Sequence, residues 1–598
     1  MAVELLKRSE VREEDTWKVK DMYESVEDWE KELTAIRSIV DKVAEYEGKV
    51  VESAGSLLAV LSGLAEAGEK LGLAFNYAER LFDEDQTNTA HQAMNAKAYS
   101  AYAEMESRVA FVDPEILAAP QELLERYYEE SDELPLYRKQ IEEIRRRKAH
   151  CLSAEMEKLL AMTAEMSQTP ADAFSILSNA DLVLPEIVDE NGEKVRLTSG
   201  RYGQFIQSAD RRVRKDAFEA MYSTYKQFLN TFASLYNGNV KQQIFQAKAR
   251  KYASTLEAAV DANHVSPDVY QNLIETVSQN LDKMHRYVSL RKKCLGTEDL
   301  HMYDIYTPMI PDMAKTISFE EAKETVLKAL APLGEDYVAK VKEGFENRWI
   351  DVYENQGKRS GAYSAGAYGC HPYVLLNYNG TLDDVFTLAH EMGHAMHSYY
   401  SNETQPYIYA EYKIFVAEVA STCNEALLIH DLMEKTEDKK EKAYLINYFL
   451  EQFRTTLYRQ TMFAHFEQEM HQKVEQGETL TADVLCDAYY ALNQKYYGEA
   501  MVSDDLIRYE WARIPHFYTP FYVYQYATGF SAAIAISTKI LAKEEGIVEK
   551  YKAFLSGGCS MDPIDLLKLC GVDMEKKEPV EEALKVFEQY LTELEKLV

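Results

Sequence analysis

The stretch TLDDVFTLAHEMGHAMHSYYSN, residues 381–402, decides the fold and the chemistry expected of this chain. It holds three of the 13 histidines, His390, His394 and His397, with Glu391 among them. In a helix, residues four apart project from one face, so the imidazoles of His390 and His394 can share one metal ion. Glu391 points to the side of that pair, where its carboxylate can reach a water without ligating the metal. The stretch predicts a metal-bearing helix with hydrolytic chemistry.

Other residues of this stretch also favour a helix, and their spacing shows which of them can bind the metal. Thr381 is a good helix cap, and Asp383 and Asp384 follow in the first turn, where the helix dipole favours negative charge. Gly393 costs a helix about 1 kcal/mol relative to alanine, which indicates that something approaches the helix backbone closely there. Three ligands on successive turns of one straight helix cannot easily converge on one ion. His397 is therefore interpreted as a packing residue or as support for a ligand.

Two imidazoles are too few for a zinc site, so a third ligand is expected nearby. The segment YAEYKIFVAEVASTCNEALLIHDLMEK, residues 409–435, has helical periodicity and carries Glu411, Glu418 and Glu425. Glu418 and Glu425 are two turns apart on one face, and Glu418 has apolar neighbours, where a carboxylate is costly unless it is paired or bound to metal. One of the two can ligate while the other orients a ligating histidine. Spacing alone leaves that choice open, and Glu411 is interpreted as a solvated charge.

Composition excludes several classes of protein. The 598 residues exceed what one compact core supports, so more than one domain is expected. With only 25 glycines and 15 prolines, long stretches are free to be helical, which predicts a mainly α protein. The net charge of −33 opposes binding to a phosphate backbone, so nucleic acid is not an expected partner.

The sequence also predicts a cytoplasmic protein without a membrane partner. No apolar run approaches the roughly 20 residues that cross a bilayer. The first segment, MAVELLKRSEVREEDTW, carries charges where a signal peptide would be apolar. Seven cysteines, odd in number and without a C-x-x-C pair, indicate a reducing compartment.

Two segments depart from the helical pattern. VLPEIVDENGEKVRLTSG, residues 183–200, alternates around Asn191-Gly192, a strong hairpin signal that marks the expected end of an N-terminal helical region. KRSGAYSAGAYGCHPYVLLNYNGT, residues 358–381, is a loop rich in glycine and tyrosine, followed by a strand candidate in PYVLLNY. A strand edge beside a reactive helix suits an extended peptide. The peptide-binding residues expected in this loop are Gly361, Tyr363 and Gly366.

Several segments resemble the zinc oligopeptidases related to thimet oligopeptidase and neurolysin, and most closely their oligoendopeptidase F branch. They include GTLDDVFTLAHEMGHAMHS, FVAEVASTCNE, QSADRRVRKDAFEAMYSTY, RYVSLRKKCLG and WARIPHFYTPFYVYQYATGFSAA, which span most of the chain. The resemblance implies a mainly α fold of two helical lobes enclosing a deep substrate channel, with a small β element beside the zinc helix. It implies an N-terminal helical region, residues 1–184, and a catalytic domain, residues 185–598, with the zinc helices at 381–433.

The resemblance also implies roles for individual residues. His390, His394 and Glu418 would bind one Zn²⁺ per chain, Glu391 would be the general base and Glu425 would support a ligand. In the C-terminal motif, His516, Tyr522 and Tyr524 match positions that hold substrate and stabilise the oxyanion, and Tyr518 is expected to contact substrate. A short gap in the match leaves open which of Tyr518, Tyr522, Tyr524 or Tyr526 carries the oxyanion role.

The function expected from these motifs is endopeptidase activity on short, unfolded peptides, by a monomer or weak homo-oligomer. One alternative is a dipeptide-releasing carboxypeptidase, because relatives of angiotensin-converting enzyme also carry an H-E-M-G-H helix. An aminopeptidase is disfavoured, since no G-x-M-E-N segment is present to grip a free amine. A helical interaction scaffold with a vestigial motif is the alternative from a different class.

Overall fold

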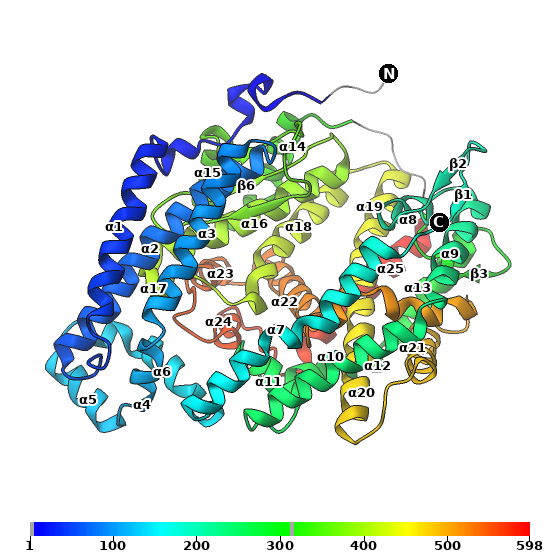
Figure 1. Ribbon diagram of the computed structural model, residues 1–598. Coiled ribbons are helices and arrows are strands. Elements are labelled where there is room, and N and C mark those ends of the chain that lie inside the picture. Colours follow the sequence, from blue (N-terminus) through cyan, green and yellow to red (C-terminus); the bar gives the residue numbers. More distant parts are fainter. Residues whose placement is uncertain (1–4, 311–315) are drawn as a thin grey trace. The chain divides into compact units, whose positions relative to one another are not determined.

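Helices make up most of the chain in a computed structural model that describes residues 5–310 and 316–598 (Figure 1). This confirms the mainly α fold predicted from the low glycine and proline content. Every helix in the described part is too short or too polar to cross a membrane. The first four residues of the charged N-terminal segment lie outside the described ranges.

The chain forms two compact units, each built from three separate segments. Unit 1 comprises Met1–Ala149, Lys315–Asp431 and Ile536–Gly571, and unit 2 comprises His150–Ala314, Leu432–Ala535 and Val572–Val598. The stretch at 381–402 therefore belongs to unit 1, and the aromatic motif at 511–533 belongs to unit 2.

Unit 1 is a set of helices with one small sheet. Its helices are α1 (Val26–Ala44), α2 (Ala54–Glu84), α3 (Thr89–Val109), α4 (Val112–Ala118), α5 (Gln121–Glu130), α6 (Arg138–Arg146), α14 (Phe319–Ala329), α15 (Glu335–Glu346), α16 (Leu382–Thr404), α17 (Tyr407–Ala410), most of α18 (Ile414–Lys435), the last part of α22 (Tyr524–Leu541), α23 (Ile547–Leu555) and α24 (Pro563–Leu569).

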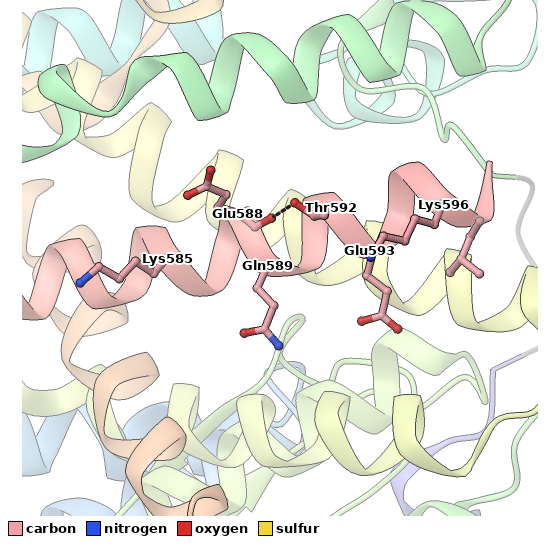
Figure 2. Close-up of a pocket in the computed structure, with 7 residues that line it drawn as sticks. Lys585, Glu588, Gln589, Thr592, Glu593 and Lys596 are labelled. Atoms are coloured by element: carbon pink, nitrogen blue, oxygen red, sulfur yellow. Dashed lines mark hydrogen bonds between the residues drawn. The ribbon is translucent and has the colours of Figure 1, made fainter.

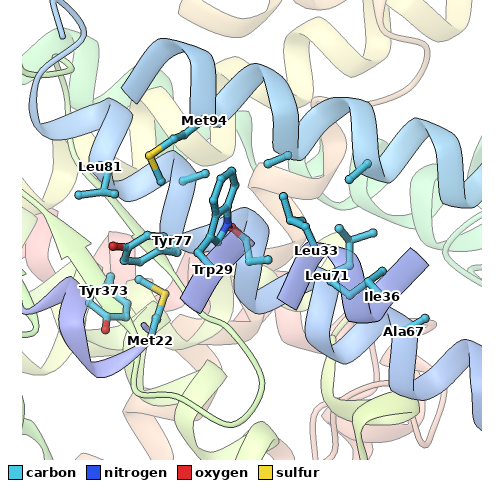
Figure 3. Packing of buried hydrophobic residues seen from close by; sticks show 14 of the residues in the cluster. Met22, Trp29, Leu33, Ile36, Ala67, Leu71, Tyr77, Leu81, Met94 and Tyr373 are labelled. Atoms are coloured by element: carbon cyan, nitrogen blue, oxygen red, sulfur yellow. The ribbon is translucent and has the colours of Figure 1, made fainter. Parts of the chain in front are cut away.

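The packing of α1 against α2 and α3 shows how the helical spacing of apolar residues builds unit 1. Trp29, Leu33 and Ile36 recur on one face of α1 and are all buried. Figure 3 shows Trp29 near Tyr77 of α2 and Met94 of α3, and Leu33 and Ile36 near Leu71 of α2. The indole nitrogen of Trp29 donates a hydrogen bond to the Ala74 carbonyl at 2.9 Å, so the polar atom of this large side chain is satisfied.

A three-stranded sheet precedes helix α16 in unit 1. Its strand order is β4 (Ile350–Asp351), β6 (Tyr373–Leu375), β5 (Tyr363–Ala365), with β6 parallel to β4 and antiparallel to β5. The strand predicted in PYVLLNY is therefore confirmed as β6, and all three of its residues are buried. Tyr373 joins the same apolar cluster as α1 to α3, which ties this sheet to the core of unit 1 (Figure 3).

Helix α16 begins where the sequence predicts. Thr381 is its cap, and its hydroxyl accepts a hydrogen bond from the Asp384 backbone N–H at 3.2 Å. The Asp384 carboxylate accepts in return from the Thr381 backbone N–H at 2.9 Å. This reciprocal cap satisfies two N–H groups at the helix start, so α16 begins at a defined residue.

Unit 2 is also mainly helical, with two small two-stranded sheets. The hairpin predicted at Asn191-Gly192 is confirmed, since Ile187 pairs with Val195 in antiparallel register. The elements are α7 (Ala154–Ile176), β1 (Glu186–Val188), β2 (Lys194–Arg196), α8 (Ser199–Phe205), α9 (Arg211–Lys226), α10 (Leu229–Ala249), α11 (Thr255–Asp261), α12 (Pro267–Gln279), α13 (Leu281–Cys294), β3 (Leu300–His301), α19 (Lys439–Gln452), α20 (Arg459–Glu475), α21 (Ala482–Tyr497), β7 (Met501–Val502), the first part of α22, and α25 (Glu578–Leu597).

Glu467 of α20 makes the stability of unit 2 depend on pH. It is fully buried, and burial raises the pKa of its carboxyl from 4.5 to about 8, against an opposing hydrogen bond from the Phe521 backbone. An acid whose pKa is higher in the folded than in the unfolded state costs stability as pH rises from about 4.5 to about 8, because the unfolded chain loses its proton first. A tenfold difference in proton affinity between the two states corresponds to about 1.4 kcal/mol.

We therefore expect Glu467→Gln to change the pH profile of thermal unfolding. The wild-type melting temperature should fall more steeply between pH 5 and pH 9 than that of the variant, whose amide does not ionise. Scanning calorimetry at a series of pH values gives both curves. Parallel curves would show that Glu467 ionises normally in the folded chain.

Candidate metal centre

Helices α16 and α18 bring three donor atoms together in unit 1. The Nε2 atoms of His390 and His394 are 3.2 Å apart. The Glu418 Oε2 atom lies 3.4 Å from His390 Nε2 and 3.5 Å from His394 Nε2. The three form an almost equilateral triangle, with one carboxylate from α18 facing two imidazoles from α16. The structure thus places the three residues predicted as ligands in one cluster.

The dimensions of this triangle fit a tetrahedral metal ion. Ligands about 2.1 Å from a zinc ion in tetrahedral geometry are about 3.4 Å from one another, which matches the three separations. Burial favours the neutral form of His390, but the Glu418 and Glu425 carboxylates outweigh burial and raise its pKa. The two carboxylates therefore favour a positive charge beside His390, and a bound cation would supply it. Two nitrogens and one carboxylate oxygen form a donor set suited to zinc.

Glu391 lies beside the triangle with an unused oxygen. Its side chain is 7 % exposed, and its Oε2 has no hydrogen-bond partner within residues 5–310 and 316–598. Burial raises the pKa of this carboxyl, although His390 and His394 oppose the shift. An orphaned carboxylate oxygen next to three converging donors is the arrangement expected for a base that receives a proton from a water.

Two side chains of α18 hold the donors in place. The Glu425 carboxylate accepts a hydrogen bond from His390 Nδ1, which leaves the Nε2 of that imidazole to face the triangle. The Ser421 hydroxyl lies 3.2 Å from Glu418 Oε2 and donates to it. Sequence reasoning anticipated Glu425 but missed Ser421, which lies one turn after Glu418 and carries no motif of its own.

Gly393 allows α16 and α18 to cross closely. A Cβ atom at this position would lie 2.5 Å from the Ser421 Cα and 2.7 Å from the Ala420 carbonyl oxygen. Both are backbone atoms, so the helices would have to separate to admit a methyl group. The Asn424 side-chain amide donates to the Ala389 carbonyl at 3.1 Å and joins the two helices at the same crossing. The predicted close approach at Gly393 is therefore confirmed.

Gly393→Ala should destabilise the chain by about 2 kcal/mol, because overpacking costs about 1–3 kcal/mol and outweighs the gain in helix propensity. Separation of the helices should also move Glu418 away from the histidines and weaken metal retention. Gly72→Ala on α2 is the matched control, since nothing lies within 4 Å of its Cβ position. Chemical unfolding of both variants measures the difference, and equal stabilities would exclude a steric role for Gly393.

His397 does not join the donor triangle. It is fully buried, and its ring stacks on Tyr412 at a centroid separation of 3.7 Å with an interplanar angle of 3°. Burial lowers its pKa to about 3, so the imidazole stays neutral. Neither ring nitrogen has a hydrogen-bond partner in the described part of the chain. These contacts are those of a packing residue in α16.

The glycine- and tyrosine-rich loop lies against α16. A Cβ at Gly366 would lie 3.1 Å from the Ser398 Cβ, so glycine permits the loop to approach the helix. Gly361 has φ +85°, a conformation that favours glycine. Tyr363 donates from its hydroxyl to the Asp83 carboxylate at 2.6 Å, so its side chain is tied to α2. Gly366 and Ser398 line a cavity of about 250 Å³ beside α16.

Unit 2 gathers part of the predicted aromatic motif into a cluster, defined here as the His516 cluster. The rings of His516, Tyr522 and Tyr526 lie within 5.3–6.2 Å of one another, measured between centroids. All three are half-buried, and burial lowers the pKa of His516. The neutral imidazole and the two phenols can each donate a hydrogen bond.

The remaining tyrosines of the motif point elsewhere. Tyr524 is 1 % exposed, and its ring packs 5.1 Å from Tyr270 in the interior of unit 2. Tyr518 stacks on Phe174 of α7 at 4.3 Å. Sequence reasoning grouped Tyr522 with Tyr524, whereas the residue beside Tyr522 is Tyr526, four positions later, at the start of α22. No local sequence signal marks Tyr526 as the neighbour of Tyr522, because Tyr522 lies outside α22.

A separate depression of about 730 Å³ lies along α25 in unit 2 (Figure 2). Charged and polar side chains of this helix line it, including Lys585, Glu588 and Lys596. None of the predicted site residues contributes to its wall, so the depression does not change the assignment of the metal centre.

Comparisons with known proteins identify the family of this chain. The sequence profile of peptidase family M3 matches residues 204–586, and that of oligopeptidase F matches residues 115–183. Oligopeptidase PepF of Bacillus subtilis is 47 % identical over 597 residues, a match that covers 100 % of this chain and 89 % of that protein. An oligoendopeptidase F homolog of Lactococcus lactis is 42 % identical over 99 % of this chain and 98 % of its own.

Solved structures agree as well. The crystal structure of oligoendopeptidase-F from Enterococcus faecium is 39 % identical, with a TM-score of 0.75 over 96 % of this chain and 99 % of that one. A Chlamydophila abortus structure assigned as a peptidase is 36 % identical, with a TM-score of 0.93 over 100 % of both chains. The chain is a metalloendopeptidase that belongs to peptidase family M3, in its oligoendopeptidase F branch.

Proposed function

We propose that this metallopeptidase is zinc-dependent and cleaves short, unfolded oligopeptides at internal bonds, with one zinc ion held by His390, His394 and Glu418. The family supports a metallopeptidase that acts on oligopeptides. The observation that carries the finer proposal is the donor triangle, with edges of 3.2–3.5 Å. Those edges match the ligand spacing of a tetrahedral zinc ion.

Glu391 performs the proton transfers in this proposal. When bound, zinc acts as a Lewis acid that brings the pKa of a water to about 7 and polarises a carbonyl group. Glu391 accepts the proton of the attacking water and later donates a proton to the amine that leaves as the peptide bond breaks. Burial raises the pKa of Glu391, which makes its carboxylate a stronger base toward the proton of the water. Glu425 keeps the His390 imidazole oriented throughout.

On the basis of the family resemblance, we assign the hydrogen bonds to the oxyanion to the His516 cluster. Tyr522 and His516 are our candidates, because their polar atoms are not committed to the core as that of Tyr524 is. A donor aimed at the developing negative charge contributes on the order of 3 kcal/mol to catalysis. Tyr526 lies against both rings and supports their orientation.

Peptide binding is assigned to the loop and sheet edge beside α16. Strand β5 is the outer strand of its sheet, so its backbone can pair with an extended substrate. Nothing lies within 4 Å of the Cβ position of Gly361, and the cavity at Gly366 has room for a substrate side chain. Tyr363 shapes the edge through its bond to Asp83. Tyr518 is retained as a substrate contact in unit 2.

Further parts of the proposal rest on the family resemblance. They are a channel that encloses the substrate and excludes folded proteins, a cytoplasmic location, and a monomer or weak homo-oligomer. The division into an N-terminal region, residues 1–184, and a catalytic domain, residues 185–598, belongs to the same proposal.

Mass spectrometry of digested peptides tests this function. A mixture of peptides with acetylated N-termini and amidated C-termini is incubated with the protein, with and without a chelator. We expect internal cleavage that the chelator stops and added zinc restores. Sparing of all blocked peptides would indicate an exopeptidase such as a dipeptide-releasing carboxypeptidase. Absence of both zinc and chelator-sensitive cleavage would indicate a scaffold.

A further inference from the structure

Unit 2 contains a buried carboxyl group that the proposed mechanism does not use. Glu467 of α20 is 0 % exposed. Its Oε1 accepts a hydrogen bond from the Phe521 backbone N–H at 2.7 Å. Its Oε2 has no hydrogen-bond partner, and the residue forms no ion pair, within residues 5–310 and 316–598. Apart from Phe521, no donor among the described residues compensates the burial of this group.

Stability does not account for a carboxyl at this position. A buried polar group with an unsatisfied atom costs free energy, and an apolar side chain of similar size would avoid that cost. Burial raises the pKa of Glu467 to about 8, so the group is mainly protonated near neutral pH. Tyr236 and Tyr270 lie near enough to interact electrostatically with Glu467, and neither phenol supplies a positive charge.

The residue that Glu467 holds has an unusual backbone. Phe521 has φ +49°, in the left-handed region that a bulky side chain rarely adopts. Its ring packs against His471 at 4.6 Å and against Tyr270 at 5.5 Å. Helix α20 thus holds the Phe521 N–H, and helices α20 and α12 both pack against its ring. Tyr522 follows it directly and enters the His516 cluster, defined above as His516, Tyr522 and Tyr526.

We propose that Glu467 is a positioning residue for Tyr522: its carboxyl oxygen holds the Phe521 N–H so that the chain turns through a left-handed residue and presents the Tyr522 phenol beside His516. This inference rests on the proposed catalytic role of the His516 cluster. Without the acceptor, Phe521 relaxes toward an ordinary backbone conformation and the Tyr522 hydroxyl moves. A displacement of about 1 Å in a catalytic group costs on the order of 100-fold in rate.

Three substitutions of Glu467 distinguish the effect of its acceptor oxygen from the effects of its volume and its burial. Glu467→Gln keeps an acceptor oxygen at the same reach and removes the ionisable group. Glu467→Met keeps the volume and removes the acceptor. Glu467→Asp keeps a carboxyl but shortens the side chain by one methylene, so the oxygen no longer reaches Phe521. If the methionine variant does not fold, the aspartate variant replaces it in the test. Each full-length variant is assayed for kcat, KM, zinc content and thermal unfolding with a quenched peptide substrate.

We expect the glutamine variant to keep kcat within about threefold of wild type. The methionine and aspartate variants should lose about 10- to 100-fold in kcat with KM and zinc content nearly unchanged. Equal losses in all three variants, or losses in KM alone, would overturn the proposal.

A double-mutant cycle with Tyr522→Phe shows whether Glu467 acts through Tyr522. In the Tyr522→Phe background, Glu467→Met (or Glu467→Asp) should lower kcat by less than about threefold. Additive losses would assign Glu467 a general structural role, and a fully active Tyr522→Phe variant would also overturn the inference. The proposed function fails on a different result, namely hydrolysis that survives Glu391→Gln.

Discussion

Glu391→Gln is expected to lower kcat by about 1,000-fold or more while one zinc per chain is retained. Glutamine has nearly the same shape as glutamate, but its amide cannot accept the proton of the attacking water or deliver one to the leaving amine. Glu391 is not part of the donor triangle, so its loss leaves His390, His394 and Glu418 in place. Activity on a quenched peptide and zinc content by inductively coupled plasma mass spectrometry give the two quantities.

Glu403→Gln is the matched control for this substitution. Glu403 lies in the last turn of the same helix, α16, and is exposed. The control should keep both activity and zinc. If Glu391→Gln lost zinc together with activity, Glu391 would be a ligand or a structural support, and the base would have to be another residue.

Glu418→Ala is expected to lose zinc altogether on dialysis. Its carboxylate is the single donor from α18, and its removal leaves two imidazoles, which are too few for a stable site. Burial would raise the pKa of Glu418, but hydrogen bonds from His390 and His394 outweigh burial and lower it. The carboxylate is therefore ionised and ready to ligate across the neutral pH range.

Glu425→Ala provides the graded comparison. This residue contacts His390 Nδ1 on the side away from the triangle, and the loss of such a support typically weakens metal affinity by about 10- to 100-fold. Competition with a chelating dye should rank affinity as wild type, then Glu425→Ala, then Glu418→Ala. The reverse order of the two variants would mean that Glu425 is the ligand and Glu418 its support.

The sequence predicted those features that depend on spacing within one helix or one turn. The imidazoles of His390 and His394 converge because residues four apart share a helix face, and the hairpin at Asn191-Gly192 follows from its turn residues. Glycine lowers helix stability, so Gly393 indicated a close contact at that point. The sequence could not show that the contact is with the backbone at Ala420 and Ser421.

Contacts between segments that are far apart in the sequence could not be predicted from local spacing. The bond between Glu467 and Phe521 spans 54 positions, and no local pattern marks either residue. The choice among the tyrosines of the C-terminal motif depends on which rings the surrounding helices bury. Tyr524 packs on Tyr270, a residue far away in the sequence, and is thereby removed to the interior. The assembly of each compact unit from three segments is another such long-range property.

Anomalous diffraction at the zinc absorption edge, from crystals of the full chain, tests the metal centre most directly. We predict one strong peak per chain about 2.1 Å from each of three atoms, namely His390 Nε2, His394 Nε2 and Glu418 Oε2. A peak bounded by other residues, or its absence from crystals grown with zinc, would contradict the proposed site.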